Sequence, residues 1–202
     1  MNLPNKITLS RIFLVPIFML FIIPIPKWLM NAEFLGGMHE QLVIINHFIM
    51  KNGNYIAAIF FIIAASTDGV DGYIARKRKQ VTIFGKFLDP IADKLLVTAA
   101  IIALVERREV TGWSAMIIIG REFMVTGLRL VAAGEGIVIS ASKWGKIKTV
   151  MQVIAISVSL IPVSSFINFP IDNYLMLIAI IITVYSGYDY IAKNVSVLKH
   201  DY

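Results

Sequence analysis

The chain has 202 residues, of which 57% are hydrophobic and 16% are charged, and its mean hydropathy is +0.75. A composition this apolar excludes an ordinary water-soluble domain. On so apolar a chain, the formal net charge of +6 indicates the cytoplasmic loops of a membrane protein, and we predict no nucleic-acid partner. The absence of cysteine excludes disulfides, thiolate catalysis and cysteine-ligated metal sites.

Six segments are long and apolar enough to cross a bilayer as helices, which takes about 20 residues each. In chain order they are residues 9–26, 54–75, 84–105, 112–133, 146–168 and 172–193. The connection 27–53 is the longest, and its apolar stretches favour a short helix in the membrane interface. Because no repeat or linker divides the sequence, we predict one domain over residues 1–202. The predicted fold is an all-α integral membrane protein with six transmembrane helices and an N-terminal cytoplasmic juxtamembrane segment.

The orientation of these spans follows from the basic residues in alternate loops. Loops on one side contain twelve Lys and Arg, whereas loops on the other side contain four. Positively charged loops stay in the cytoplasm. We therefore expect a multi-pass protein of the plasma membrane with both termini, and the active site, on the cytoplasmic side.

Charged residues also occur inside the predicted spans, where they are costly. A charge at the bilayer centre costs about 2.5–3.5 kcal/mol on insertion scales, so a group of them indicates a functional site or, alternatively, a structural ion-pair network. Most of these charges fall toward the predicted cytoplasmic ends of their helices, and we expect them to meet in one cytoplasm-facing cavity. They are Asp68, Asp71, Asp89, Asp93, Lys94, Arg121, Glu122 and Arg129.

Four of these residues are carboxylates in two pairs with helical spacing. Asp68 and Asp71 are three residues apart, and Asp89 and Asp93 are four apart, so each pair shares one helix face. Four facing carboxylates cannot all stay ionised without a compensating cation. Oxygen ligands without Cys or His favour Mg²⁺ or Mn²⁺, and a pair of such ions recurs in phosphoryl-transfer enzymes. The pattern therefore predicts a metal site, most simply with two ions.

The first carboxylate pair shares its helix face with residues suited to a phosphate-bearing ligand. At about 100° per residue, Gly72, Ala75 and Arg76 fall in the same sector as that pair. Two positions with little or no side chain leave space, and the arginine supplies a cation. This face can support a bound phosphate.

The stretch from Asp68 to Asp93 resembles the signature of the CDP-alcohol phosphotransferases. It matches every specified position of the pattern D-x-x-D-G-x-x-A-R-x(8)-G-x-x-x-D-x-x-x-D. The resemblance implies six membrane spans, divalent-metal dependence and a homodimer. It also implies metal ligation by Asp68, Asp71, Asp89 and Asp93, general-base catalysis by Asp93, and nucleotide contacts from Asn5, Thr8, Asp68, Gly72, Ala75, Arg76 and Gly85.

Three further stretches, residues 2–11, 120–129 and 142–149, are similar to family members whose acceptor is glycerol 3-phosphate. The implied reaction is attack by the 1-hydroxyl of glycerol 3-phosphate on the lipid-side phosphorus of CDP-diacylglycerol, which releases CMP. The acceptor brings its own phosphate and needs cations beside the aspartates. The candidates are Arg121, Lys146 and Lys148 first, then Arg129 and Lys143.

Three other functions stay open at this point. A family member could use serine, inositol phosphate or a second lipid as acceptor. Intramembrane prenyltransferases also bind a metal-diphosphate through paired aspartate motifs. A divalent-cation or proton transporter would carry membrane carboxylates too. The charges here lie at one end of the helices instead of forming a relay through them, which favours an enzyme over a transporter. We expect membrane lipids as its other partners.

Overall fold

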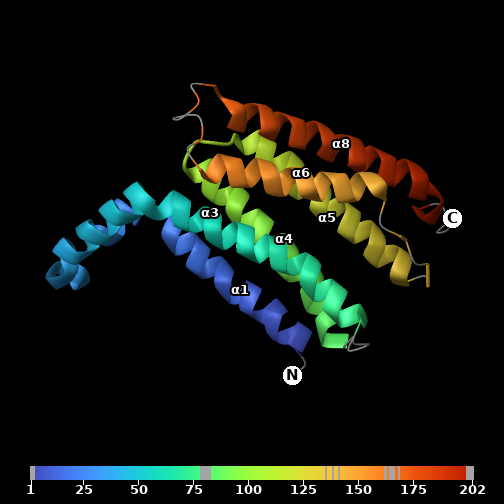
Figure 1. The fold of residues 1–202 in the computed structure, drawn as a ribbon, viewed down its shortest axis with the longest axis horizontal. Helices are drawn as coiled ribbons and strands as arrows, with labels where there is room; N and C mark the ends of the chain where they lie inside the picture. Colours follow the sequence, from blue (N-terminus) through green and yellow to red (C-terminus); the bar gives the residue numbers. More distant parts are fainter. Residues whose placement is uncertain are drawn as a thin grey trace. The chain divides into compact units, whose positions relative to one another are not determined.

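The computed structural model describes the backbone of residues 3–77, 83–134, 142–161 and 169–198, together with residues 136, 137, 139, 140, 163 and 167. These residues are almost entirely helical and none of them lies in a strand, so the all-α prediction is confirmed for this part of the chain (Figure 1). The helices form two compact units, residues 1–107 with 160–162, and residues 108–159 with 163–202.

The first unit is a helical hairpin packed against the N-terminal helix. Its elements are α1 (Leu3–Ile22), α2 (Lys27–Met30), the 3-10 helix η1 (Glu33–Met38), α3 (His39–Lys77) and α4 (Ile83–Glu106). Helix α1 packs on both α3 and α4. Its buried face includes Val15, Phe18 and Ile22, which recur at helical spacing, and the Phe18 ring lies 6.3 Å from that of Phe61 on α3. Helix α1 thus buries an apolar face in this unit.

Helix α1 ends at Ile22, four residues before the predicted end of the first span. Pro24 lacks an amide hydrogen and disfavours helical geometry in the residue before it, which explains the early end. The Arg107 guanidinium donates a hydrogen bond of 3.1 Å to the Ile22 carbonyl. A cation at a helix C-terminus satisfies a carbonyl that has no partner within the helix. The end of α1 is therefore anchored to the end of α4.

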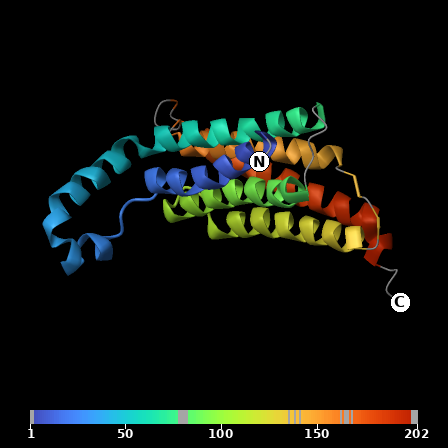
Figure 2. The same cartoon turned by 90° about the horizontal axis from the view of Figure 1, so that it is seen from below.

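The sequence predicted that residues 27–53 connect the first two spans. This prediction is wrong for residues 39–53, because α3 begins at His39 and includes them. Asn52 and Gly53 resemble a turn in sequence, yet they lie inside this helix. A Cβ at Gly53 would overlap the Phe21 carbonyl oxygen, so the glycine allows α1 and α3 to approach closely. The first part of α3 extends beyond the end of α1 (Figure 2), and Asn46 Oδ1 there accepts a hydrogen bond of 2.8 Å from the Ile25 amide.

The second unit contains α5 (Gly112–Gly134), α6 (Lys143–Leu160) and α8 (Ile171–Leu198). Helices α5 and α8 pack through Val125, Leu128 and Tyr190. The Gln152 amide of α6 donates 3.1 Å to the Thr183 hydroxyl of α8, which in turn donates 2.6 Å to the Ala179 carbonyl. This buried polar chain ties α6 to α8. Helix α6 ends eight residues before the predicted limit of the fifth span.

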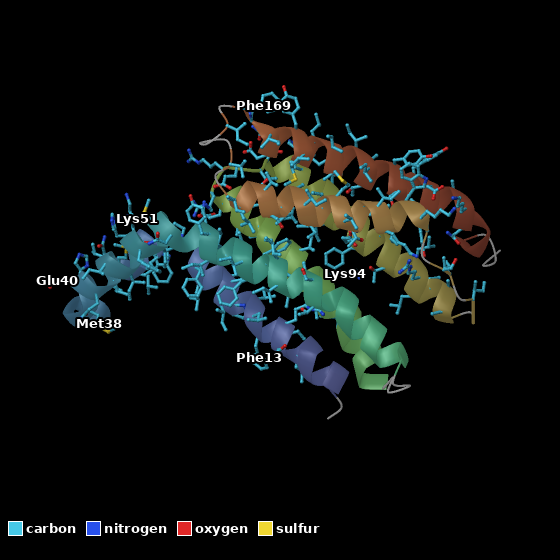
Figure 3. The ribbon with its side chains drawn as sticks, in the orientation of Figure 1. Phe13, Met38, Glu40, Lys51, Lys94 and Phe169 are labelled. Atoms are coloured by element: carbon cyan, nitrogen blue, oxygen red, sulfur yellow. The ribbon has the colours of Figure 1, made fainter. Side chains whose placement is uncertain are left out.

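Each predicted span overlaps a long helix, and two of these helices meet the length and hydropathy expected for crossing a membrane. The qualifying stretches among the described residues are Gly36–Thr67 and Ile171–Asn194. Large apolar side chains also face outward. Phe13 is 69% exposed and extends away from α1 (Figure 3), and Trp113 is 81% exposed. Apolar outer faces of this extent are typical of helices that contact lipid.

Candidate active site

The aspartate signature falls at one end of the first unit. Asp68 and Asp71 lie in the C-terminal part of α3, and Asp89 and Asp93 lie in the first turns of α4. Residues 78–82 join these two helices, which contact each other. Both views place the start of α1 at this same end (Figures 1 and 2). The backbone thus brings three helix ends together around the signature.

The side chains of the signature lie outside the described ones, as do those of the expected nucleotide contacts on α1. These residues are Asn5, Thr8, Asp68, Asp71, Gly72, Ala75, Arg76, Gly85, Asp89 and Asp93. Among the side chains that the structure does describe, no three His, Asp or Glu residues gather closely enough to hold a metal ion. The donor chemistry of the signature, four carboxylates on two contacting helices with no Cys or His between them, fits a hard divalent ion.

Arg11, one of the twelve basic residues counted for the cytoplasmic loops, lies inside α1. It is 2% exposed and lies on the same face of α1 as Val15 and Phe18. The spacing of these three residues, i, i+4 and i+7, is the signal that could have identified it as buried. Burial of a guanidinium requires compensating charge or hydrogen bonds. Arg11 follows Thr8 by one turn, so this cation lies toward the end of α1 nearest the signature.

The second unit brings two of the expected acceptor cations to one carboxylate. Arg121 on α5 is 9% exposed, and its Nη2 donates 2.8 Å to Ser186 Oγ on α8. Its Nη1 lies 3.8 Å from Glu122 Oε1, the same oxygen that accepts a hydrogen bond from Lys148 Nζ on α6. Two cations therefore share the carboxylate of Glu122.

A glycine on α8 makes space for this cluster. A Cβ at Gly187 would lie 3.2 Å from Arg121 Cγ, closer than side chains normally pack. The Nε atom of Arg121 is buried without a hydrogen-bond partner among the described atoms. A buried donor without a partner is unfavourable, and an anion could supply the missing acceptor. Ser186 and Gly187 were not identified from sequence, because nothing in their local pattern distinguishes them from packing residues.

The remaining expected cations lie elsewhere on the second unit. Arg129 Nε donates 2.8 Å to the Tyr190 hydroxyl, and its guanidinium lies 5.3 Å from the centre of that ring. Lys143 lines a cavity beside the end of α8, whereas Lys146 is exposed on α6. The structure thus joins Arg121 with Lys148 and places Arg129, Lys143 and Lys146 outside that ion-pair cluster.

Comparison with known proteins identifies the family. The family model of the CDP-alcohol phosphatidyltransferases matches residues 1–185. The chain belongs to this family. It is 48% identical over 200 residues to the CDP-diacylglycerol–glycerol-3-phosphate 3-phosphatidyltransferase of Bacillus subtilis, covering 98% of this chain and 97% of that protein.

Two more distant relatives support the same family assignment. A probable phosphatidylglycerophosphate synthase of Mycobacterium tuberculosis is 36% identical over 95% of this chain and 81% of its own length. A CDP-diacylglycerol–glycerol-3-phosphate 3-phosphatidyltransferase of Rickettsia typhi is 35% identical over 94% of both chains. The resemblance that rested on the aspartate signature is therefore confirmed across nearly the whole chain. Family membership and the apolar helices together indicate a membrane protein.

Proposed function

We propose that this enzyme transfers the phosphatidyl group of CDP-diacylglycerol to glycerol 3-phosphate and forms phosphatidylglycerophosphate and CMP. The observation that carries this proposal is the complete aspartate signature on α3 and α4, in a chain nearly half identical to a relative named for that reaction. The stretches around Arg121 and Lys148 support glycerol 3-phosphate as the acceptor.

In this mechanism Asp93 accepts the proton of the acceptor 1-hydroxyl. A hydroxyl is a poor nucleophile until a base within hydrogen-bond reach removes its proton. The oxygen then bonds to the lipid-side phosphorus while the bond from that phosphorus to the CMP oxygen breaks. CMP leaves with that electron pair. Each phosphorus keeps its oxidation state, and the proton on Asp93 passes to solvent.

We assign the metal site to Asp68, Asp71, Asp89 and Asp93, whose oxygen donors suit Mg²⁺ or Mn²⁺, with two ions in the simplest arrangement. When bound, these ions neutralise charge that develops on the pyrophosphate. Gly72, Ala75 and Gly85 leave space for the nucleotide, Arg76 binds a phosphate, and Asn5 and Thr8 contact the nucleotide from α1. Fixed positive groups and backbone space are most of what phosphoryl transfer requires of a protein.

The acceptor phosphate is bound by the cations of the second unit in this proposal. Arg121 and Lys148 are held by Ser186 and Glu122, so their side chains are oriented before the substrate binds. Lys146 is the next candidate, and Arg129 and Lys143 add positive charge. The buried Arg121 Nε, which has no hydrogen-bond partner among the described atoms, supports an anionic ligand.

The helices and the basic residues support a particular membrane arrangement. We propose that α1, α3, α4, α5, α6 and α8 each cross the plasma membrane, with both termini and the active site in the cytoplasm. The lipid substrate enters from the bilayer and glycerol 3-phosphate from water. We further propose that residues 1–202 act as one functional domain and that the enzyme is a homodimer, as the family resemblance implies.

The decisive experiment measures CMP release by the purified chain in mixed micelles that contain CDP-diacylglycerol. Glycerol 3-phosphate should support release, a chelator should abolish it, and added Mg²⁺ or Mn²⁺ should restore it. Serine, inositol phosphate and a lipid alcohol serve as competing acceptors. Release with serine and none with glycerol 3-phosphate would overturn the acceptor. Metal-dependent ion flux in vesicles without CMP release would favour the transporter.

A further inference from the structure

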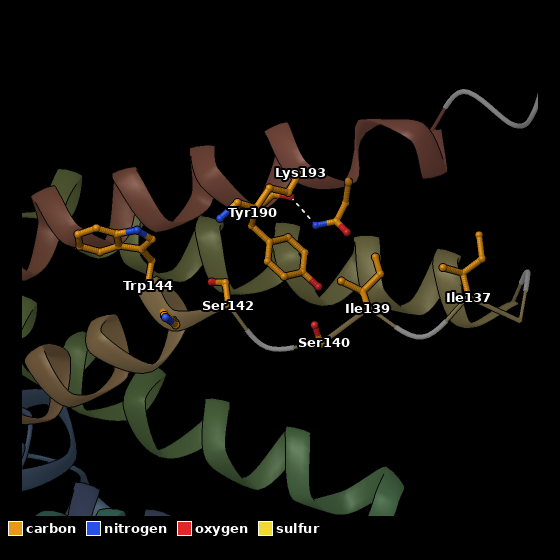
Figure 4. A pocket seen from close by; sticks show the side chains of 9 residues that line it. Ile137, Ile139, Ser140, Ser142, Trp144, Tyr190 and Lys193 are labelled. Atoms are coloured by element: carbon orange, nitrogen blue, oxygen red, sulfur yellow. Dashed lines mark hydrogen bonds between the residues drawn. The ribbon is translucent and has the colours of Figure 1, made fainter.

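The second unit contains a cavity of about 610 Å³ at the end of α8, and Arg121, Glu122 and Lys148 are not among the residues that line it. Three stretches line it: the connection after α5, the start of α6 and the last turns of α8 (Figure 4). Its volume is in the range of pockets that bind small molecules. The lining residues are Ile137, Ile139, Ser140, Ser142, Lys143, Trp144, Tyr190, Lys193 and Asn194.

The charges around this cavity are mostly positive. Lys143 and Lys193 line it, and Arg129 lies behind Tyr190. Lys193 Nζ is 2.6 Å from Asp189 Oδ1, and its side chain is 64% exposed. Among the described groups that line or adjoin the cavity, three cations thus outnumber one carboxylate. The start of α6, capped by the Ser142 hydroxyl, adds the positive end of a helix dipole.

Polar groups in the cavity can also donate hydrogen bonds. The Tyr190 hydroxyl accepts its bond from Arg129, so its own proton is available to a ligand. Figure 4 shows this hydroxyl directed toward Ile139 and Ser140. The Asn194 amide is held by a 2.7 Å bond to the Tyr190 carbonyl, which stabilises this last turn. Lysines and hydroxyls together form a donor set suited to phosphate oxygens.

The rest of the lining is apolar, which argues for an amphiphilic ligand. Ile137, Ile139 and Trp144 form this part, and the Trp144 ring packs edge-on against Tyr185 at 4.6 Å between ring centres. A small soluble anion gains nothing from such a surface. A phospholipid headgroup with its glycerol backbone contacts both the cations and the apolar side chains.

The position of the cavity along α8 supports the same ligand. The candidate membrane span Ile171–Asn194 ends at the residues that line the cavity. The end of a spanning helix lies at the level of the lipid headgroups, and basic residues there attract anionic lipids. We propose that this cavity binds the headgroup of an anionic phospholipid, with Lys143 and Lys193 on its phosphate. The cavity adjoins the secondary acceptor candidates Arg129 and Lys143, and binding of a lipid headgroup there requires no catalysis.

The test measures retention of phosphatidylglycerol by the full chain in neutral detergent, using native mass spectrometry with phosphatidylcholine as competitor. The wild type should retain phosphatidylglycerol preferentially. Each of Lys143→Gln and Lys193→Gln should weaken retention about fivefold, because a basic residue near a membrane surface contributes roughly that factor. The matched control is Lys51→Gln, which removes an exposed lysine from α3 in the first unit.

Three results would overturn the proposal. The first is unchanged retention in the double variant at Lys143 and Lys193. The second is an equal loss in Lys51→Gln, which would show non-specific attraction. The third is displacement of the lipid by millimolar glycerol 3-phosphate, which would assign the cavity to a soluble phosphate. Neither CDP-diacylglycerol nor glycerol 3-phosphate is present when lipid retention is first measured. A loss of lipid retention is therefore distinguishable from a failure of the proposed enzyme activity.

Discussion

Glu122 is the residue whose replacement most directly tests the buried charge cluster of the second unit. Its carboxylate accepts a hydrogen bond from Lys148 and lies 3.8 Å from Arg121, and the three side chains are between 5% and 16% exposed. The variant Glu122→Gln keeps the shape of the side chain and removes its charge. Two cations then share a poorly solvated space with no carboxylate between them.

The magnitude follows from this burial. Breaking a buried ion pair by removing one partner costs about 3–5 kcal/mol, and we take about 3 kcal/mol because Glu122 retains some contact with solvent. A change of 1 kcal/mol shifts Tm by roughly 2–4 °C in a chain of this size. Glu122→Gln should therefore lower Tm by about 6–12 °C.

Thermal unfolding in detergent, followed by loss of the monodisperse peak in size-exclusion chromatography, measures this shift. The matched control is Glu106→Gln, an exposed glutamate at the end of α4. Adding Lys148→Met to Glu122→Gln should recover part of the loss, because the second cation that faced Glu122 is then removed. A Tm of Glu122→Gln within about 2 °C of the wild type would refute the cluster as a buried network. A decrease in Tm of the double variant equal to the sum of the decreases in the two single variants would refute it as well.

Three further outcomes follow from the proposed site and the fold. Asp93→Asn should keep Mn²⁺ binding in a titration, but its rate of CMP release should fall at least about 100-fold. Asp68→Asn should lose both Mn²⁺ binding and CMP release. A wild-type rate of CMP release in Asp93→Asn would show that Asp93 is not the base. Gly53→Ala should lower Tm by several degrees because its methyl group overlaps the Phe21 carbonyl, while Gly127→Ala, which has open space, should not. Tyr190→Phe should raise KM for glycerol 3-phosphate severalfold with kcat within about twofold, since Arg129 loses the hydroxyl that orients it; an unchanged KM would contradict this.

A matched control separates the role of Asp93 from a general effect of losing an aspartate. Asp172 lies in the first turn of α8, outside the signature, and Asp172→Asn removes a carboxylate in the same way. Its CMP release should stay close to that of the wild type. Loss of release in both variants would show damage to the fold instead of loss of a base.

The positions of the long helices were predictable from sequence because hydropathy over about 20 residues is a local property. The residues at which these helices end were less predictable. Pro24 terminates α1 early, and Gly53 turned out to be a point of helix contact where the sequence suggested a turn. The difference depends on Phe21, a residue 32 positions away, and no local pattern contains that information.

The same division applies to the candidate site. The spacing of the aspartates from Asp68 to Asp93 determined the family and the metal hypothesis by itself, because residues three and four apart on a helix must share a face. Tertiary structure alone decided that Arg121 and Lys148 share Glu122, that Ser186 and Tyr190 hold the arginines, and that Arg11 is buried. Those contacts join helices far apart in the chain, and burial and pairing of a charge depend on which neighbours the packed helices bring to it.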